Sequence, residues 1–334
     1  MKVEKIRVSI GSASVLGLGS MVKFKNPPTT CYLMTYKEGH CTANCGFCPQ
    51  ARSSKSSEEM LSRVTWPIFP FKDYLTKIKY LPLSKQFKRI CIQTLNYPDN
   101  FRDLMEIITK IKQYIKVPIS VAIPPMSKDR LKELKIAGVQ RIGIALDGTT
   151  PEIFNRIKGD EVDGPYKWKQ HFQKLLEALD IFSEGFVSTH LIIGLGETER
   201  DVIARIEELH QLRILISLFA FTPIKGTKFE SFDQPSILNF RKLQLGRYLI
   251  VNKGKTRSDF AFNTKGDIVY FNISKKEMKD IINNTEAFLT SGCPGCNRPY
   301  YTSRPSGPIY NFPRKLKESE NEEIYDLLNG FVNK

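Results

Sequence analysis

The chain has 334 residues, enough for one large α/β barrel or two ordinary domains, and its 41% apolar and 25% charged residues exclude a disordered protein. Fifty Lys and Arg against 35 Asp and Glu give a net charge of +15, so we expect attraction to acidic partners such as an acidic protein substrate. The basic residues are scattered among acidic ones and form no run interleaved with aromatic residues, which argues against nucleic-acid binding.

The sequence also indicates where the protein works. No apolar stretch approaches the roughly 18 residues that span a bilayer, so we expect no membrane partner. The first seven residues, from Met1 to Arg7, lack the apolar core of a secretory signal. Seven cysteines, an odd number at metal-type spacings, argue against a disulfide framework. We therefore expect a reduced, cytoplasmic, metal-binding enzyme.

Apolar β-rich runs alternate along the chain with segments of helical periodicity. Apolar residues from Phe101 to Ile115 recur every three or four positions, which predicts an amphipathic helix. Thr198 and Asp201 resemble a capping box that opens a helix over 202–212. After about residue 252 the pattern changes to a hairpin and a helix over 275–288. The strand candidates cover residues 31–36, 89–94, 119–123, 141–146, 187–193 and 215–221.

Alternating strands and helices with continuous apolar strands predict a parallel sheet covered by helices. The number of such units favours a TIM-type (β/α) barrel of six to eight parallel strands, complete or partial, over an open doubly wound sheet. We assign residues 1–272 to this barrel and its N-terminal lead-in. Residues 273–334 form a C-terminal helix and a cysteine-containing extension packed on the barrel. Functional residues of such barrels lie at the carboxyl ends of the strands.

Three cysteines with the spacing C-x3-C-x2-C follow the first predicted strand directly, at Cys41, Cys45 and Cys48. A structural zinc ion takes four protein ligands, so three thiols make an incomplete zinc site. A [4Fe–4S] cluster has four irons, and three thiolates leave one iron open to an external ligand. A zinc or inert iron–sulfur site is the alternative, but the position at the functional end of the barrel favours the open cluster.

This triplet, with Phe47 before its last cysteine, resembles the signature of the radical S-adenosylmethionine (SAM) superfamily. The resemblance implies that Cys41, Cys45 and Cys48 hold a [4Fe–4S] cluster whose fourth iron is chelated by SAM, and that Phe47 contacts the bound SAM. An electron passed through that cluster would cleave SAM to methionine and a 5′-deoxyadenosyl radical. The protein would then supply orientation and exclude solvent.

Further segments resemble biotin synthase and its relatives. The residues after Cys48, Pro-Gln-Ala-Arg, resemble its cluster loop, and Cys91 lies in a strand resembling one whose cysteine binds a second cluster. The resemblance implies that Asp147 contacts the ribose hydroxyls of SAM, which suits a carboxylate. It also implies that Ile192 and Gly194 lie beside the adenine, where small residues let a ring approach the backbone. The alternatives are a helix cap for Asp147 and a tight turn for the glycine.

The chain departs from biotin synthase where that family holds its auxiliary [2Fe–2S] cluster. The strand over 119–123 has no cysteine, and the strand over 187–193 has serine and histidine where a cysteine is expected. A cluster of that type therefore cannot be assembled in the usual way.

Four cysteines remain outside the triplet. Cys293 and Cys296 form a C-x2-C pair, which presents two thiols to one metal. We expect a second, auxiliary cluster there, with Cys91 as a further ligand. Cys31 is the weaker ligand candidate, because a buried strand cysteine more often belongs to the core. A zinc knuckle, a redox pair or a chance pair are the alternatives.

The tail from Cys293 to Tyr301, followed by Arg304-Pro-Ser-Gly-Pro, resembles the two-component lipoyl synthases of archaea, and this resemblance covers essentially the whole chain. It implies a radical SAM sulfurtransferase that removes hydrogen from the sixth or eighth carbon of a protein-bound octanoyl chain. The auxiliary cluster would be the sulfur donor. The resemblance assigns no catalytic side chain, and Ser303 and Ser306 do not match the serine ligand of classical lipoyl synthases.

The same resemblance implies three partners: an octanoylated acidic carrier of the lipoyl-domain or glycine-cleavage H-protein type, a second radical SAM subunit, and an electron donor such as ferredoxin. The charge of +15 would steer the enzyme towards an acidic carrier. Arg298, Arg304 and Arg314 either dock that carrier or stay solvated. Two other functions stay open, namely a biotin-synthase-like or other radical SAM enzyme acting on a small molecule, and a non-catalytic iron–sulfur or zinc-binding module.

Overall fold

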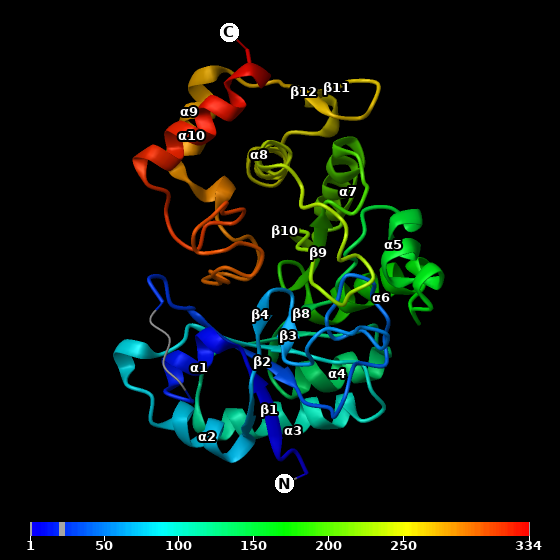
Figure 1. Cartoon of the computed structure of the whole chain (residues 1–334), viewed down its shortest axis with the longest axis vertical. Helices are drawn as coiled ribbons and strands as arrows, with labels where there is room; N and C mark the ends of the chain where they lie inside the picture. Colours follow the sequence, from blue (N-terminus) through cyan, green and yellow to red (C-terminus); the bar gives the residue numbers. More distant parts are fainter. Residues whose placement is uncertain (1, 20–23, 334) are drawn as a thin grey trace.

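The computed structural model describes residues 2–19 and 24–333, and one eight-stranded sheet dominates it (Figure 1). The strand order is β10-β9-β8-β7-β6-β2-β1-β5. The parallel part of the sheet consists of β2, β6, β7, β8, β9 and β10, whereas β1 pairs antiparallel with β2 and β5. The sheet comprises β1 (Lys5–Val8), β2 (Thr30–Thr35), β5 (Ile68–Pro70), β6 (Arg89–Gln93), β7 (Ile119–Ala122), β8 (Val139–Gly143), β9 (Val187–Ile193) and β10 (Leu215–Ala220).

Helices connect the parallel strands, and two small hairpins complete the regular structure. The helices are α1 (Ile10–Leu16), α2 (Phe71–Lys79), α3 (Asn100–Tyr114), α4 (Lys128–Ile136), α5 (Pro151–Lys158), α6 (Trp168–Phe182), α7 (Glu199–Gln211), α8 (Ile237–Lys253), α9 (Lys275–Asn284) and α10 (Glu318–Leu328). The hairpins pair β3 (Met60–Leu61) with β4 (Val64–Thr65) and β11 (Phe260–Phe262) with β12 (Ile268–Phe271). Single 3-10 turns cover Leu83–Lys85, Asp160–Val162, Arg257–Asp259, Glu286–Phe288 and Asn329–Phe331.

The fold class predicted from the alternating pattern is confirmed, since six parallel strands of the described residues alternate with covering helices. The capping box is also confirmed: the Thr198 hydroxyl accepts from Asp201 N, and the Asp201 carboxylate accepts from Thr198 N. The helix predicted over 275–288 ends at Asn284, because Thr285 takes a left-handed backbone angle of φ 67°. The boundary at residue 272 stays a prediction.

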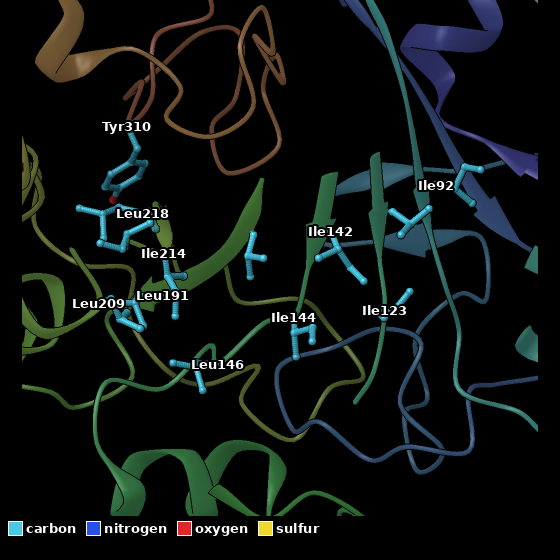
Figure 2. Packing of buried hydrophobic residues seen from close by; sticks show 14 of the residues in the cluster. Ile92, Ile123, Ile142, Ile144, Leu146, Leu191, Leu209, Ile214, Leu218 and Tyr310 are labelled. Atoms are coloured by element: carbon cyan, nitrogen blue, oxygen red, sulfur yellow. The ribbon is translucent and has the colours of Figure 1, made fainter. Parts of the chain in front are cut away.

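Alternate residues of each parallel strand face opposite sides of the sheet. The outer side is apolar and packs against the helices, as Ile92, Ile142, Leu191 and Leu218 do in the buried cluster of Figure 2. The inner side carries Arg89, Cys91, Gln93, Ser120, Arg141, Ser188, His190 and Ser217, which line internal cavities. A barrel interior is usually filled by branched apolar side chains, so this polar lining indicates an interior that binds something.

The C-terminal segment connects the two sides of the sheet. The described strands include no pairing between β10 and β5. Instead, Leu218 N of β10 donates to Ser291 Oγ (3.2 Å), and Thr29 N, next to β2, donates to Asn297 Oδ1 (3.0 Å). In Figure 1 this orange segment leads from α9 towards the sheet. The segment therefore carries Cys293 and Cys296 into the space between β10 and β2.

None of the described helices combines the length and the apolar character that a bilayer span requires.

Candidate functional site

The cysteine triplet lies in a tightly hydrogen-bonded loop beyond the carboxyl end of β2. Cys48 N donates to Cys45 O (3.0 Å), which closes a turn around the last two cysteines. The thiol sulfur of Cys41 accepts from Ala43 N (3.4 Å) and from Asn96 N (3.1 Å), the latter from the loop after β6. These bonds place three half-buried thiols together at the predicted end of the barrel.

The thiols of this loop are a donor set that suits a metal cluster. Burial raises the pKa of Cys45 to about 12, and burial followed by the neighbouring Cys45 raises the pKa of Cys48 well above its ordinary value. Ionising three adjacent buried thiols therefore requires a nearby positive charge, which iron supplies on coordination. In the described part of the chain, no three His, Cys, Asp or Glu side chains already converge on one metal position.

A cavity opens beside this loop at the carboxyl ends of the strands. Phe47, Asp147 and Ile192, all predicted to contact SAM, line it together with Cys48. Gly194 is not part of the lining. Its N–H donates to Glu197 Oε1 (2.6 Å), and at φ 104° a Cβ would lie 2.8 Å from the Pro235 ring, so the glycine is required by a tight turn.

Asp147 is the buried charged group of this cavity. One carboxylate oxygen pairs with Lys158 Nζ (2.6 Å) and the other with His190 Nε2 (2.9 Å). Burial alone would raise the pKa of Asp147, but the charges of Lys158 and His190 hold it well below its ordinary value. A carboxylate fixed by a lysine and a histidine can still accept ribose hydroxyls through its remaining lone pairs. The sequence indicated Asp147 but neither partner.

A second cavity lies on the inner side of the sheet, and three of the remaining cysteines line it. Cys91 projects from β6, and Cys293 and Cys296 come from the C-terminal segment. Gln93 Nε2 lies 3.0 Å from Cys91 Sγ, and the Tyr32 hydroxyl lies 3.1 Å from Cys296 Sγ. Burial raises the pKa of Cys91 to about 12, and the other two cysteines contribute to the shift.

Cys31 does not belong to this group. In the register of β2 and β6, Cys31 is paired with Ile90 and Tyr32 with Cys91, so Cys31 faces the outer, helix-covered side. It is fully buried, and its sulfur lies 3.8 Å from the Tyr74 hydroxyl on α2. The ligand role expected for Cys31 does not fit this position, because a β-strand cannot turn neighbouring side chains to the same face.

The two cavities share a wall. Gln93, His190, Phe219 and Arg298 line both of them. The Arg298 guanidinium lies 4.8 Å from the centre of the Phe219 ring and also contacts Tyr32 and Tyr301. Arg298 is therefore neither a surface docking residue nor a solvated one, contrary to both expectations from the sequence. The sequence contained no signal for this position, because it depends on how the tail enters the barrel.

Comparison with known proteins identifies the family. The model of the radical SAM superfamily matches residues 39–209, just over half of the chain. The matched region includes the cysteine triplet, Cys91 and Asp147, and the strands β6 to β9. The chain therefore belongs to the radical SAM superfamily.

The curated relatives and the solved structures agree with this assignment. Biotin synthase of Methanococcus aeolicus is 32% identical over 225 residues, which cover 64% of this chain and 63% of that protein. Biotin synthase of Campylobacter hominis is 28% identical and matches 60% of this chain and 59% of its own length. The chain thus spans about three fifths of the length of these relatives. Methylornithine synthase shares the fold, with a TM-score of 0.56 at 14% identity over 97% of this chain and 88% of its own. A [FeFe]-hydrogenase maturase from Carboxydothermus hydrogenoformans does so with a TM-score of 0.53 at 17% identity, over 90% of this chain and 67% of its own.

Membership of this family makes the chain a radical SAM enzyme with a [4Fe–4S] cluster and SAM as cofactors. Cys41, Cys45 and Cys48 are the residues that fit the cluster, and the first cavity fits SAM. Together the two groups supply a 5′-deoxyadenosyl radical. The cysteine loop and the residues of the first cavity would hold them, with Asp147 paired to Lys158 and His190 beside them.

Proposed function

We propose that the chain is a radical SAM sulfurtransferase, a component of a lipoyl synthase that inserts sulfur into an octanoyl chain bound to a carrier protein. The observation that carries this proposal is the second cavity. Cys91, Cys293 and Cys296 line it, and it shares a wall with the SAM cavity. Three thiols suit an auxiliary iron–sulfur cluster, and a radical enzyme with a sulfur-rich second site is equipped to form a C–S bond.

The residues around the first cavity support an alkyl substrate. Its lining is mostly apolar and aromatic, and it includes Leu61, Phe219 and Phe221. An octanoyl chain would gain about 0.8 kcal/mol for each CH₂ group buried there. Gln93, His190 and Arg298 lie at the wall that the two cavities share. The target carbon of the octanoyl group would face both the radical and the sulfur there.

The net charge supports a protein-bound substrate. A chain of +15 attracts an acidic carrier of the lipoyl-domain or glycine-cleavage H-protein type and raises the rate of encounter. Arg304 in the tail and Lys55 near the cluster loop are both exposed and available for such a contact. A second radical SAM subunit and an electron donor such as ferredoxin complete the proposed system.

A second candidate function is sulfur insertion into a free small molecule, as in biotin synthase. The identity to proteins with that name favours it. The inner face argues against the same auxiliary cluster, since Ser120 on β7 and Ser188 and His190 on β9 occupy the cavity where cysteines were expected. The cationic Arg298 at the shared wall would suit a small substrate with a carboxylate.

An anaerobic assay separates the two functions. The reconstituted chain is incubated with SAM, a reductant and either an octanoylated carrier or dethiobiotin, with and without a candidate second subunit. The lipoyl proposal expects a carrier whose mass increases by bound sulfur. It fails if 5′-deoxyadenosine forms and the carrier never gains sulfur under either condition, and a gain on dethiobiotin alone would establish the second function.

The matched variants Cys293→Ala and Cys31→Ala test the second site. Cys293→Ala should abolish sulfur transfer and leave SAM cleavage measurable, because Cys293 lines the second cavity and not the first, whereas Cys48 lines the first. Cys31 lies on the outer face of the sheet, so Cys31→Ala should retain both sulfur transfer and SAM cleavage.

A further inference from the structure

The floor of the second cavity is cationic. Arg89 at the start of β6 and Arg141 on β8 line it, together with the hydroxyls of Ser120 and Ser188. Arg89 is only 5% exposed. One of its terminal nitrogens donates to Ser120 Oγ (2.9 Å) and the other to Gln140 Oε1 (2.8 Å), but its Nε has no partner in the described residues.

The two arginine charges have no acidic partner there. Among the described residues that line this cavity there is no aspartate or glutamate. The Nε of Arg141 is also buried and without a partner among the described residues, as is the hydroxyl of Thr30, which is paired with Arg89 in the sheet and lines the same cavity. Burial lowers the pKa of Arg141, Cys293 opposes this shift, and the nearby Arg89 charge adds to it. Two neighbouring cations and unpaired donors in a shielded space are unfavourable unless an anion joins them.

The position of the floor indicates what this anion is. The Ser120 hydroxyl, which accepts from Arg89, lies 3.5 Å from Cys293 Sγ. An anion held between Arg89 and Arg141 would therefore sit next to a thiol that faces the same cavity. A small, soft anion that is compatible with thiols and iron fits this position better than a phosphate or a carboxylate.

We propose that Arg89, Arg141 and Ser120 form a binding site for hydrosulfide beside Cys293. The use of this site rests on the proposed function: each sulfur insertion removes one sulfur atom from the auxiliary centre, which must be replaced. Hydrosulfide replaces it as sulfide with release of one proton, and this step needs neither an oxidant nor a reductant. The shared chemistry is a sulfide anion, whose source is either free hydrosulfide or the cluster itself.

The structure also provides a separate route to this site. Gly292, Cys293 and Cys296 line both the second cavity and a third cavity. That third cavity is lined in addition by Arg247 and Asn297, and by none of the residues that face the SAM cavity. Hydrosulfide can thus approach from the tail side without displacing SAM.

The first experiment uses the full-length chain free of iron and kept reduced, with sodium hydrosulfide or sodium bromide as the probe. A ligand that binds the folded state raises the unfolding temperature in a saturable way. We expect this saturable rise in the wild type, with fluoride at equal ionic strength as the reference. In the double variant Arg89→Met/Arg141→Met the affinity should fall at least about tenfold, since both charge-assisted contacts are gone. Arg304→Met, an exposed arginine of the tail, should behave as the wild type.

Two further readouts keep the result decisive. If the double variant does not fold, Ser120→Ala alone should weaken hydrosulfide binding several-fold. Crystals soaked in bromide should show an anomalous peak within hydrogen-bond distance of Arg89 and Arg141. A wild type without a saturable response, or variants with unchanged affinity, would overturn the site.

The second experiment distinguishes the source of the anion. The iron-loaded chain is mixed with isotopically labelled hydrosulfide, and label in acid-labile sulfide is measured without any octanoyl carrier. Slower uptake in the double variant, with normal iron at the triplet, supports delivery of free hydrosulfide. If the double variant takes up label at the wild-type rate, Arg89 and Arg141 bind the sulfide of the cluster itself. This result would overturn the proposal that they deliver free hydrosulfide. Neither measurement requires sulfur insertion, so a failed lipoyl assay leaves both interpretable.

Discussion

The two cysteine regions of this barrel are built in different ways. The triplet occupies a single loop of eight residues, held by bonds within the loop and to Asn96. The second region combines Cys91 of a central strand with Cys293 and Cys296 of a tail that lies far away in the sequence. The first is a local motif, whereas the second exists only when the tail is docked. Changes in the two regions should therefore have separable consequences.

The charges around the two regions also differ. The SAM cavity contains a carboxylate, Asp147, whose oxygens are paired with Lys158 and His190. The second cavity contains Arg89, Arg141 and Arg298 and no acidic residue among its described lining. The first site is prepared for a cofactor with hydroxyls and its own positive charge, and the second for an anionic centre.

The largest expected effect is the loss of all chemistry in Cys45→Ala. The open-iron cluster cannot form with two thiolates, so production of 5′-deoxyadenosine should fall by more than about 100-fold, since loss of groups that merely support metal ligands already costs up to that much. Iron should fall from about eight to about four atoms per chain if the second region holds its own cubane. Chromatography of 5′-deoxyadenosine and iron quantitation measure both. Retention of SAM cleavage would show that the triplet is not the radical centre.

A smaller and more selective effect is expected from the pair Cys91→Ala and Cys31→Ala. Both residues lie on neighbouring strands and are buried, but only Cys91 faces the second cavity. Cys91→Ala should lose the auxiliary iron and sulfur transfer while it still cleaves SAM. Cys31→Ala should keep both and lose roughly 1–2 kcal/mol of unfolding free energy through a small cavity. Iron counts and urea unfolding compare them, and equal loss of iron in both variants would contradict the assignment of faces.

The sequence predicted best what is encoded locally. The triplet, the capping box at Thr198 and the order of strands and helices all follow from residues close together in the chain. Strand β8 is an instructive exception, because it covers Val139–Gly143 and not 141–146. The next residues stay extended beside β9, with Ile144 N donating to Ser188 O (3.0 Å), so their apolar pattern resembles that of a strand.

What the sequence did not predict depends on contacts between distant segments. Lys158 ends α5 and pairs with Asp147 inside the molecule, and no local pattern marks a lysine for burial. Arg298 enters the barrel only because Asn297 bonds to Thr29 and Ser291 bonds to β10. Residue type alone does not give the side of a strand, so the sequence favours the core for Cys31 without excluding a ligand role, and the strand register decides for the core.

An intermediate effect, confined to the first region, is expected for Asp147→Asn. The neutral amide keeps the shape but loses the charge that fixes Lys158 and His190. SAM affinity of the reconstituted chain should fall roughly 10-fold, the scale of one charge-assisted hydrogen bond. Equilibrium dialysis with SAM measures it, and auxiliary iron should stay constant. Asp160→Asn, an exposed residue paired with Lys167, is the control. A parallel loss of auxiliary iron would show that the two regions are coupled.

The smallest expected effect concerns the attachment of the tail on which the second region depends. Two nitrogens of Arg314 donate to the carboxylate of Glu320 at the start of α10, both at 2.7 Å. The hydrogen bonds from Arg314 lower the pKa of Glu320, because they favour its charged form. A folded-state pKa below the unfolded value stabilises the protein at pH above the unfolded value.

This contribution is lost as the pH falls through the lowered folded-state pKa of Glu320. Because both side chains are partly exposed, Glu320→Gln should lower the unfolding free energy by at most about 1 kcal/mol at pH 7. Below about pH 4 the difference between variant and wild type should shrink, because the wild-type carboxylate becomes protonated as well. Thermal unfolding from pH 7 to pH 3 measures this, with Glu318→Gln as the control. If the difference in unfolding free energy between Glu320→Gln and the wild type does not depend on pH, Glu320 stabilises the tail through packing. The ion pair with Arg314 would then not contribute to the docking of the tail.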